Sequence, residues 1–507
     1  MLSNARSEPI WAADPTPPPM IPPLQAHTRA DVCVIGAGIA GLSVALSVLE
    51  RGHSVVVVDR RGIGAGETLR TTAHLASAID EPFTQLEHWH GRDGAQLAVA
   101  SHAAAVDLIE HWAGQYAIDC DFARVDGYLC DPARRDTTAL RRELEAAQRL
   151  GLHAEWLAEG PPGLAQLGPA LRYARQARVH PRRYLYGLAE AVLRCGGRIF
   201  ADGEVSSVEA GGAPRAHCSN GTRIDAGAIV VATNAPFQHR LALQSKIAAY
   251  RTFVIAGAVS ADTVPDALFW DVDDPYHYVR RLGRAGDTDY LIVGGEDRRT
   301  GQTPDDAQAP LQALAEWAMR YFPGFRQVDY GWSGQILEPI DGLAYIGQDP
   351  GNDNVYVVTA DSGNGMTHGT LAGPLLAALI DGQSHPWQAL YAPERKRLSG
   401  TWLSENANIS LQYGDWLSAG DVATAERIDA GQGAVVRHGL HRFAIYRDEA
   451  GRLHAYSARC PHLGCSVRWN SLERSWDCPC HGSRFDPLDG RVLNGPAASG
   501  LEPVQPD

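Results

Sequence analysis

The 507-residue sequence has no apolar run that approaches the length needed to span a bilayer. Its first twenty residues contain no charged segment followed by an apolar stretch, so we expect no secretory signal peptide. Basic residues are not in excess: 45 lysines and arginines stand against 59 acidic residues, a formal net charge of −14. These absences argue against a membrane span and against nucleic acid or an anionic membrane surface as a partner.

The composition is that of an ordinary globular protein, with 45% apolar and 21% charged residues. A chain of this length is expected to hold two or three domains. Four of the nine cysteines lie close together near the carboxyl end. This clustering makes the segment a candidate for metal or redox chemistry.

The segment contains two short patterns of metal ligands, CPHLGC over 460–465 and CPCHGS over 478–483. Together they offer two thiolates and two imidazoles to one site, which is the ligand set of a Rieske [2Fe–2S] centre. Structural zinc is the alternative, because it also takes two cysteines and two histidines. Zinc modules usually pair ligands of one kind, whereas each pair here mixes the two kinds. The pattern therefore favours an iron–sulfur cluster that carries single electrons.

The two loops resemble those of Rieske proteins of the cytochrome bc1 type, which carry a disulfide that ring-hydroxylating oxygenases generally lack. One departure concerns the cluster sulfurs: Ser483 matches a hydroxyl of the high-potential proteins, but their usual tyrosine is Phe485 here. The loss of one hydrogen bond to sulfur predicts a lower reduction potential than in the bc1 type. The resemblance implies four cluster ligands, Cys460, His462, Cys478 and His481, and a disulfide between Cys465 and Cys480.

Five cysteines lie outside the two loops and remain as free thiols. Unpaired thiols fit a reducing compartment better than an exported protein, so we expect a cytoplasmic location. A disulfide clamped between two cluster loops could be shielded there from reductants. The five are Cys33, Cys120, Cys130, Cys195 and Cys218.

The amino-terminal part carries a dinucleotide-binding pattern. Residues 31–59 contain an apolar strand, Gly36-x-Gly38-x-x-Gly41, a helical stretch and a second apolar strand that ends in Asp59. The glycines permit a tight turn, close approach of the backbone to a pyrophosphate and close helix–strand packing, while the helix amino terminus attracts phosphate. Asp59 is placed to accept hydrogen bonds from a ribose. All parts occur in order, so we expect a bound dinucleotide.

Later segments decide between FAD and NAD. Residues 61–78 are small, polar and glycine-rich, and the strand expected over 355–359 leads through the loop DSGNGMTHG to a helix expected over 370–380. No strand with a terminal acid follows that helix, so we identify no dedicated nicotinamide domain. In these segments the chain resembles the FAD-dependent amine and amino-acid oxidoreductases of the D-amino-acid oxidase type, over about residues 29 to 385.

The resemblance implies which residues contact FAD. They belong to the pyrophosphate loop, the ribose and adenine sites, the strand beside the flavin ring and the helix start at its pyrimidine edge. His74 matches in place a histidine that dimethylglycine and sarcosine dehydrogenases attach covalently to flavin, although their Ser-Thr-Trp-His is replaced by Thr72-Ala73-His74. The full set is Gly36, Gly38, Ile39, Ala40, Gly41, Asp59, Arg60, Thr71, Thr72, Ala73, His74, Val205, Ala232, Thr233, Gly365, Met366 and Thr367.

The implied fold is α/β (α+β): a Rossmann-like FAD-binding domain with an interleaved, sheet-containing substrate domain, followed by a small all-β Rieske domain. Short alternating strands are expected over 433–437, 441–446 and 453–456. The expected domains are an amino-terminal arm (1–28), the oxidoreductase domain (29–385), a linker (386–414) and the Rieske domain (415–507). Within the oxidoreductase domain the FAD part covers about 29–112, 175–237 and 335–385, and the substrate part about 113–174 and 238–334.

A strand expected over 276–280 supplies the candidate catalytic residues. It alternates so that aromatic and cationic side chains share one face. In the resembled family a strand here faces the flavin, and an arginine or tyrosine often binds the substrate carboxylate. The alternative is that the tyrosines only form a packed face. The candidates are Tyr276, Tyr278 and Arg280, together with His74.

The sequence thus predicts an FAD-dependent oxidoreductase, an amine or amino-acid dehydrogenase that oxidises a small-molecule CH–NH donor. Electrons would pass from reduced flavin to the cluster and on to a one-electron carrier protein or a quinone, with His462 and His481 as the exposed exit. Two alternatives stay open: reversed electron flow for a reductive reaction, and a redox carrier or sensor without turnover. A roomy cavity over the flavin would favour the enzyme.

Overall fold

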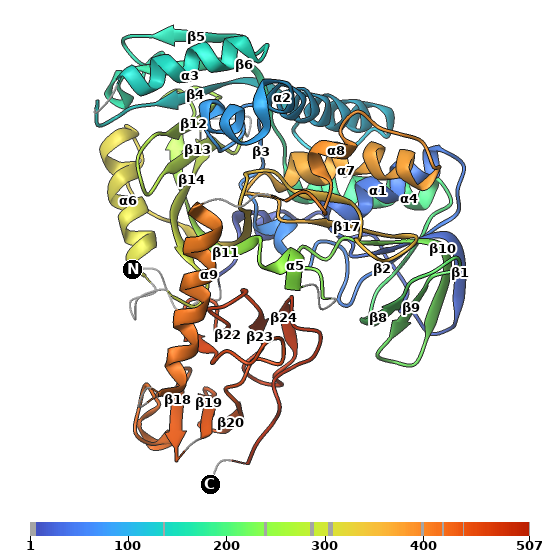
Figure 1. Cartoon of the computed structure of the whole chain (residues 1–507). Helices are drawn as coiled ribbons and strands as arrows, with labels where there is room; N and C mark the ends of the chain where they lie inside the picture. Colours follow the sequence, from blue (N-terminus) through green and yellow to red (C-terminus); the bar gives the residue numbers. More distant parts are fainter. Residues whose placement is uncertain are drawn as a thin grey trace.

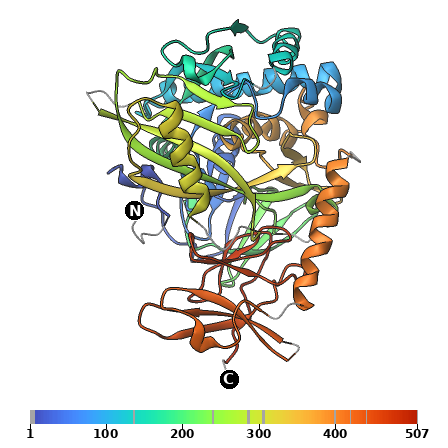
Figure 2. The same ribbon diagram turned by 90° about the vertical axis from the view of Figure 1, so that its left-hand side faces the viewer.

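The computed structural model describes residues 7–134, 137–237, 241–283, 288–302, 308–396, 400–417, 420–439 and 441–505. The first six residues of the expected amino-terminal arm lie outside these ranges. Figure 1 shows a large upper part built on two sheets and a smaller β-rich part below it, which contains the carboxyl terminus. Helix α9 (Gly400–Gln412) runs alongside both parts, as Figure 2 also shows.

The first sheet is mainly parallel, with the strand order β16-β17-β10-β1-β2-β7. Its central strands are nearly continuous apolar runs, as expected for strands that are buried on both faces. Val32 and Val34 face a core shared with helices α1, α4 and α7, whereas Cys33 and Ile35 face the opposite core. The bounds are β1 (Thr28–Ile35), β2 (Val55–Val58), β7 (Arg198–Phe200), β8 (Val205–Glu209), β9 (Arg215–Cys218), β10 (Arg223–Val231), β16 (Tyr345–Gln348), β17 (Val355–Thr359), α1 (Ile39–Glu50), α4 (Pro181–Arg194) and α7 (Gly365–Ile380).

The glycine-rich turn between β1 and α1 has the geometry that its sequence predicts. Gly36 has φ +111°, and a Cβ atom there would overlap the carbonyl oxygen of Ala232 in the neighbouring β10–α5 segment. A Cβ on Gly41 would overlap the carbonyl oxygen of Gly36. Only glycine therefore lets the turn and the first helical turn pack this closely.

Helix α7 begins at Gly365, five residues before the start that its sequence predicts. The intervening GMTHG has low helix propensity, but tertiary packing overrides it. A Cβ on Gly369 would lie 2.9 Å from Ile39 Cγ2, and one on Gly373 would lie 2.5 Å from Ser47 Oγ. These glycines are helical because they let α7 press against α1.

The second sheet is mixed, with the strand order β15-β11-β14-β13-β12-β4-β6-β3 and β5 beside β6. Helix α6 covers one face and shares a core with β11, β12 and β14. The two-residue strand β3 carries His74 onto the edge of this sheet by pairing with β6. The bounds are β3 (His74–Leu75), β4 (Ala123–Cys130), β5 (Ala154–Leu157), β6 (Ala170–Arg178), β11 (Ile247–Ser260), β12 (Leu268–Asp271), β13 (His277–Arg281), β14 (Thr288–Arg299), β15 (Tyr330–Pro339), α2 (Phe83–Gln115), α3 (Thr137–Arg149) and α6 (Ala309–Tyr321).

The carboxyl-terminal part consists of two small antiparallel sheets, β18-β19-β20 and β21-β22-β23-β24. Three of its strands lie where the alternating pattern places them, each within one residue of the expected end. The CPHLGC loop follows β20, and the CPCHGS loop joins β22 to β23. The bounds are β18 (Gly433–His438), β19 (His441–Arg447), β20 (Leu453–Ser457), β21 (Arg468–Asn470), β22 (Ser475–Asp477), β23 (Arg484–Phe485) and β24 (Val492–Asn494).

The expected linker over 386–414 is largely helical, with α8 (Gln388–Tyr391) preceding α9. Glu405 of α9 accepts hydrogen bonds from Arg299 at 2.6 Å and from the Tyr250 hydroxyl at 3.0 Å, both in the second sheet. Ile409, one turn further on, packs against the core of the carboxyl-terminal part. The helix therefore ties the two parts together. Among the described residues, no helix is both long and apolar enough to cross a membrane.

Candidate active site and cluster site

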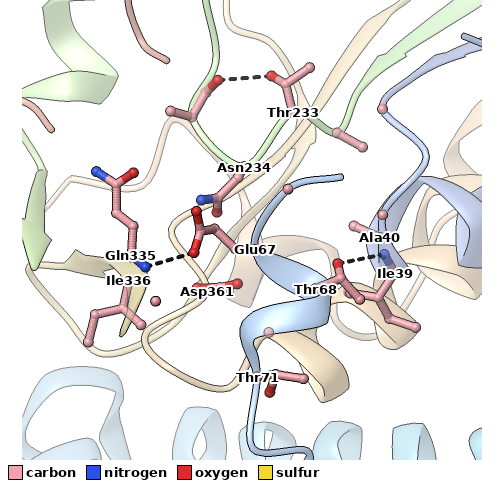
Figure 3. A pocket seen from close by; sticks show the side chains of 18 of the residues that line it. Ile39, Ala40, Glu67, Thr68, Thr71, Thr233, Asn234, Gln335, Ile336 and Asp361 are labelled. Atoms are coloured by element: carbon pink, nitrogen blue, oxygen red, sulfur yellow. Dashed lines mark hydrogen bonds between the residues drawn. The ribbon is translucent and has the colours of Figure 1, made fainter. Parts of the chain in front are cut away.

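A large cavity opens at the carboxyl edge of the parallel sheet, where ligands bind in folds of this kind. One wall is the glycine turn and the amino terminus of α1, represented by Gly38 and Ala40. The opposite wall belongs to the second sheet and includes Trp270 and Tyr278. Figure 3 shows Ile39 and Ala40 on one side of the space and Gln335 and Ile336 on the other. The cavity thus lies between the two parts that the sequence assigns to cofactor and substrate.

Most of the residues expected to contact FAD line this cavity, and three do not: Gly41, Ala73 and Thr367. Gly41 packs behind the turn, and Ala73 is fully buried with φ +57°. The Thr367 hydroxyl lies 2.8 Å from Nδ1 of His102, a buried residue of α2. These three residues support the wall from behind.

Asp59 lines the cavity, but its carboxylate oxygens already accept hydrogen bonds from backbone amides. Oδ2 accepts a hydrogen bond from the Ala37 amide at 3.0 Å, and Oδ1 accepts from the amides of Arg61 and Gly62 at 2.8 and 2.9 Å. The neighbouring Arg60 donates to the carbonyl of Leu493 in β24. This end of the cavity is therefore bordered by the carboxyl-terminal part.

His74 lines the cavity with both ring nitrogens engaged. Nε2 lies 3.2 Å from the Val279 carbonyl, so it carries the proton, and Nδ1 lies 3.1 Å from the Thr72 hydroxyl, which donates to it. Burial, followed by the nearby Arg280 charge, lowers the pKa of His74 to about 3. The imidazole is therefore neutral at physiological pH.

The segment formed by Tyr276 and strand β13 places two of its three candidate residues at the cavity. Tyr276 and Tyr278 line it, with their ring centroids 5.6 Å apart. Arg280 lies behind the wall, fully buried, and donates hydrogen bonds to the carbonyls of Ala73 at 2.8 Å and Val179 at 3.0 Å. The expected role of Arg280 in binding a substrate carboxylate does not fit this geometry. Alternation along a strand predicts that Tyr278 and Arg280 share one face of the sheet. It does not predict that the cavity ends before it reaches Arg280.

Several cavity residues carry no signal in the sequence. Asp80 and Asp361 present carboxylates, and Glu67 and Gln335 lie between the cavity and the carboxyl-terminal part. In Figure 3 the backbone N–H of Gln335 donates a hydrogen bond to Glu67 Oε2, and Asp361 lies close by. These residues come from four separate segments, so no local motif could have grouped them.

The two cysteine–histidine loops face each other in the carboxyl-terminal part. A disulfide joins Cys465 to Cys480, the pairing that the resemblance implied, with 6.4 Å between the Cα atoms. The sulfurs of Cys460 and Cys478 are within hydrogen-bonding reach of each other. Near them the sulfurs of Cys465, Cys478 and Cys480 lie within 4.8 Å of one another. Cys465 and Cys480 form the disulfide, so these three sulfurs do not make a separate metal site.

The two histidines complete the donor set. The rings of His462 and His481 are perpendicular, at 88°, with centroids 4.9 Å apart. Nδ1 of His481 is buried without a hydrogen-bond partner, as expected for a nitrogen that awaits a metal. Nε2 of His462 lies 2.7 Å from Oε1 of Gln244, which holds the orientation of the ring. Two thiols and two imidazoles therefore fit a [2Fe–2S] cluster.

The expected exposed exit through both histidines is wrong for His462. Its ring is buried, and Gln244 at the end of α5 (Leu241–Gln244) holds its outer edge. The sequence shows which residues are ligands, but the packing of the carboxyl-terminal part on the upper part decides which way they face. Figure 1 shows α5 at the lower edge of the upper part, just above β24.

The second cluster loop and the segment after β24 reach the cavity. Gln335 Nε2 donates to the Gly482 carbonyl at 2.7 Å, and Asn494 Nδ2 donates to Glu67 at 2.6 Å and to Gln335 Oε1 at 2.7 Å. Gly495, Ala497 and Ala498 form part of the cavity wall. The two sites therefore share a boundary.

Residues 31–379 match the family model for FAD dependent oxidoreductases. The chain belongs to this family. Residues 418–505 match the model for the Rieske [2Fe-2S] domain, which favours the cluster over zinc. The protein is thus an FAD-dependent oxidoreductase with a Rieske domain, as its sequence predicts, and the expected α/β and all-β architecture is confirmed.

Known relatives of this FAD-dependent oxidoreductase include YhfW of Bacillus subtilis (strain 168), whose name marks it as a Rieske iron–sulfur protein. It is 30% identical over 96% of both chains. The gamma-glutamylputrescine oxidoreductase of Escherichia coli (strain K12) is 25% identical over 72% of this chain and 85% of its own length. Among solved structures, glycine oxidase from Geobacillus kaustophilus is similar in fold, with a TM-score of 0.61 and 18% identity, over 73% of this chain and all of that chain.

Proposed function

We propose that the enzyme oxidises a CH–NH donor at FAD and passes the electrons one at a time to the [2Fe–2S] cluster, from which an outside acceptor removes them. The shared boundary between the cavity and the cluster loops carries this proposal. Gln335 lines the cavity and is hydrogen-bonded to Gly482, the neighbour of His481. The open cavity beside Tyr276 favours an enzyme over a carrier without turnover.

FAD, when bound, supplies the acceptor for the hydride that leaves the donor's C–H bond. The first turns of α1 and α7 offer backbone N–H groups and the positive ends of helix dipoles to its negatively charged portions. Gly36, Gly38 and Ala40 would hold the pyrophosphate, and Gly365 and Met366 the pyrimidine edge. The chain's own task is to position the donor and exclude water.

For the cluster we propose Cys460 and Cys478 as ligands of one iron and the Nδ1 atoms of His462 and His481 as ligands of the other. His481, the less buried ring, is the edge that remains for an outside carrier, because Gln244 covers His462. The oxidation of one amine to an imine releases two electrons, so a one-electron cluster held there would pass on two electrons, one after the other, in each turnover.

The test uses the holoenzyme without substrate. Anaerobic photoreduction of the flavin is followed by its visible spectrum and by the EPR signal of the reduced cluster. We expect the cluster signal to rise as the flavin is photoreduced. A bleached flavin beside a cluster that stays oxidised for minutes would overturn the coupling. A cluster potential below that of the flavin would instead support the reversed flow.

A further inference from the structure

The substrate end of the cavity is acidic. Asp80, which follows β3, and Asp361, which follows β17, both line it. The turn after Asp361 lies between Asp80 and a third carboxylate: a Cβ on Gly363 would lie 2.6 Å from Asp80 Oδ2, and the Ser362 hydroxyl donates to Glu338 at 2.6 Å. Asp80 also interacts electrostatically with Asp297 of β14. Four segments therefore bring carboxylates to one place.

In the described part of the chain, no basic side chain makes a direct ion pair with these carboxylates. The nearest cations act mainly on Asp297, since the charges of Arg298 and His277 oppose the rise in its pKa that burial causes, while Arg298 is paired with Glu296. Among the described residues, only acidic groups act electrostatically on Asp80. Oδ1 of Asp297 is buried without a hydrogen-bond partner. Enclosure in the protein, followed by the neighbouring carboxylates, raises the pKa of Asp80 to about 7. Like charges held this close cost free energy that a bound cation would offset.

Aromatic rings complete the same end. Tyr276 and Tyr278 line the cavity, and Asp80 and Asp297 act electrostatically on both. Trp270 lies opposite Tyr278 across β12 and β13 and lines the cavity as well. Aromatic faces beside carboxylates are the surroundings that an ammonium group prefers.

The basic residues of the cavity wall are engaged elsewhere. Arg60 and Arg61 donate to the Leu493 carbonyl, and Arg70 pairs with Glu473 of the Rieske domain at 3.2 Å. Arg280 is held behind the wall by backbone carbonyls. A substrate carboxylate would therefore meet carboxylates where it needs an arginine.

We infer that the donor is a cationic amine that bears no carboxylate, recognised by Asp80, Asp361 and the aromatic wall. This inference rests on the proposed function and names its substrate class. The bound RCH2NH3+ first gives one N–H proton to water. The resulting RCH2NH2 would give a hydride to FAD and become RCH=NH2+, which water hydrolyses to an aldehyde and ammonium. The product is again a cation that the same walls accommodate.

The first test measures binding to the oxidised holoenzyme by calorimetry and by the flavin spectrum. The probes are tetramethylammonium, which has no N–H bond and no lone pair to oxidise, and benzoate. We expect saturable binding of tetramethylammonium and at least tenfold weaker binding of benzoate. Tighter binding of benzoate would overturn the inference.

Substitutions of the cavity carboxylates test where tetramethylammonium binds. We expect Asp80→Asn and Asp361→Asn each to weaken tetramethylammonium binding about tenfold, whereas Asp353→Asn, on an exposed loop after β16, leaves it unchanged. Asparagine keeps the shape and removes an unbalanced charge, so the melting temperature and flavin content should not fall. Affinities within twofold of wild type in both cavity variants would overturn the inference.

The second test compares n-butylamine with norvaline, which is the same alkylamine with a carboxylate on the reacting carbon. We expect n-butylamine to bleach the flavin anaerobically at least tenfold faster than racemic norvaline, and faster bleaching by norvaline would overturn the inference. Photoreduction of the cluster needs no substrate, so it separates the two proposals. Normal electron transfer with failed cation binding overturns the substrate class alone, whereas failed electron transfer overturns the proposed function.

Discussion

The side-chain amide of Gln335 donates a 2.7 Å hydrogen bond to the carbonyl oxygen of Gly482. Gln335 belongs to β15 and lines the flavin cavity, whereas Gly482 follows His481 in the second cluster loop. Gly482 has φ +79°, and a Cβ atom there would overlap both Gln335 and Ala249. Glycine is therefore required at the point where the cluster loop touches the oxidoreductase domain.

This contact predicts that Gln335→Leu slows electron transfer from flavin to cluster. The variant keeps a side chain of similar size but removes the hydrogen bond to the Gly482 carbonyl. We expect a decrease of roughly tenfold, the effect of about 1.4 kcal/mol on a barrier. Flash photoreduction with optical detection of the cluster gives the rate. Gln348→Leu, at the exposed end of β16, is the control. Equal rates in both variants would rule out a role for the bond.

Glu473 links the Rieske domain to the oxidoreductase domain through buried ion pairs. Its carboxylate is buried and pairs with Arg70 at 3.2 Å and with Arg251 at 3.1 Å, both in the oxidoreductase domain. Glu473→Gln leaves these charges unbalanced, so we expect the free energy of unfolding to fall by about 3 to 5 kcal/mol. The exposed pair of Glu449 with Arg474 is the control, and Glu449→Gln should cost about 0 to 1 kcal/mol. Chemical denaturation measures both, and equal costs would contradict the buried pairing.

The same carboxylate predicts a pH dependence. Burial alone would raise the pKa of Glu473, but the charges of Arg70, Arg251 and Arg484 outweigh it and lower the pKa to about 2. The folded value lies below the unfolded one, so the stabilisation is present above pH 4.5 and is lost as the pH falls toward 2. The stability difference between wild type and Glu473→Gln should therefore be full at pH 6 and shrink below pH 4.5. A difference that stays constant down to pH 3 would contradict this assignment.

The reduction potential depends on hydrogen bonds near the cluster. The Ser483 hydroxyl accepts from the Ala497 amide at 3.0 Å and is also a hydrogen-bond partner of Cys460, while Phe485 is fully buried nearby. We expect Ser483→Ala to lower the potential and Phe485→Tyr to raise it. A bond of about 1.4 kcal/mol corresponds to roughly 60 mV for one electron. Redox titration followed by EPR measures this, with the exposed Ser499→Ala as the control. An unchanged potential in both cluster variants would contradict the prediction.

The attachment of the flavin is tested by acid precipitation. Both ring nitrogens of His74 already have hydrogen-bond partners, Val279 and Thr72, and the motif before it departs from that of the covalent flavoproteins. We therefore expect a yellow supernatant and a colourless pellet. A yellow pellet would show a covalent bond, which His74→Ala should then abolish.

Local spacing in the sequence determined the two cofactors. The glycines at 36, 38 and 41 work through backbone conformation and close packing, and the paired cysteines and histidines work through loops a few residues long. Both signals depend on neighbours in the chain, so they can be identified without a fold. The short strands of the Rieske domain follow from the same kind of local alternation.

Only the tertiary structure decided what surrounds the cofactors. Asp80, Gln335 and Asp361 line one cavity because three segments of the chain converge on it. The carboxylates of Asp80 and Asp361 repel each other only because the fold brings these segments together. Arg280 shares a strand face with Tyr278 but lies beyond the edge of the cavity, and His462 faces Gln244 because the Rieske domain packs on α5. Burial and long-range contact set these relationships, and neither is encoded in the spacing of residues along the chain.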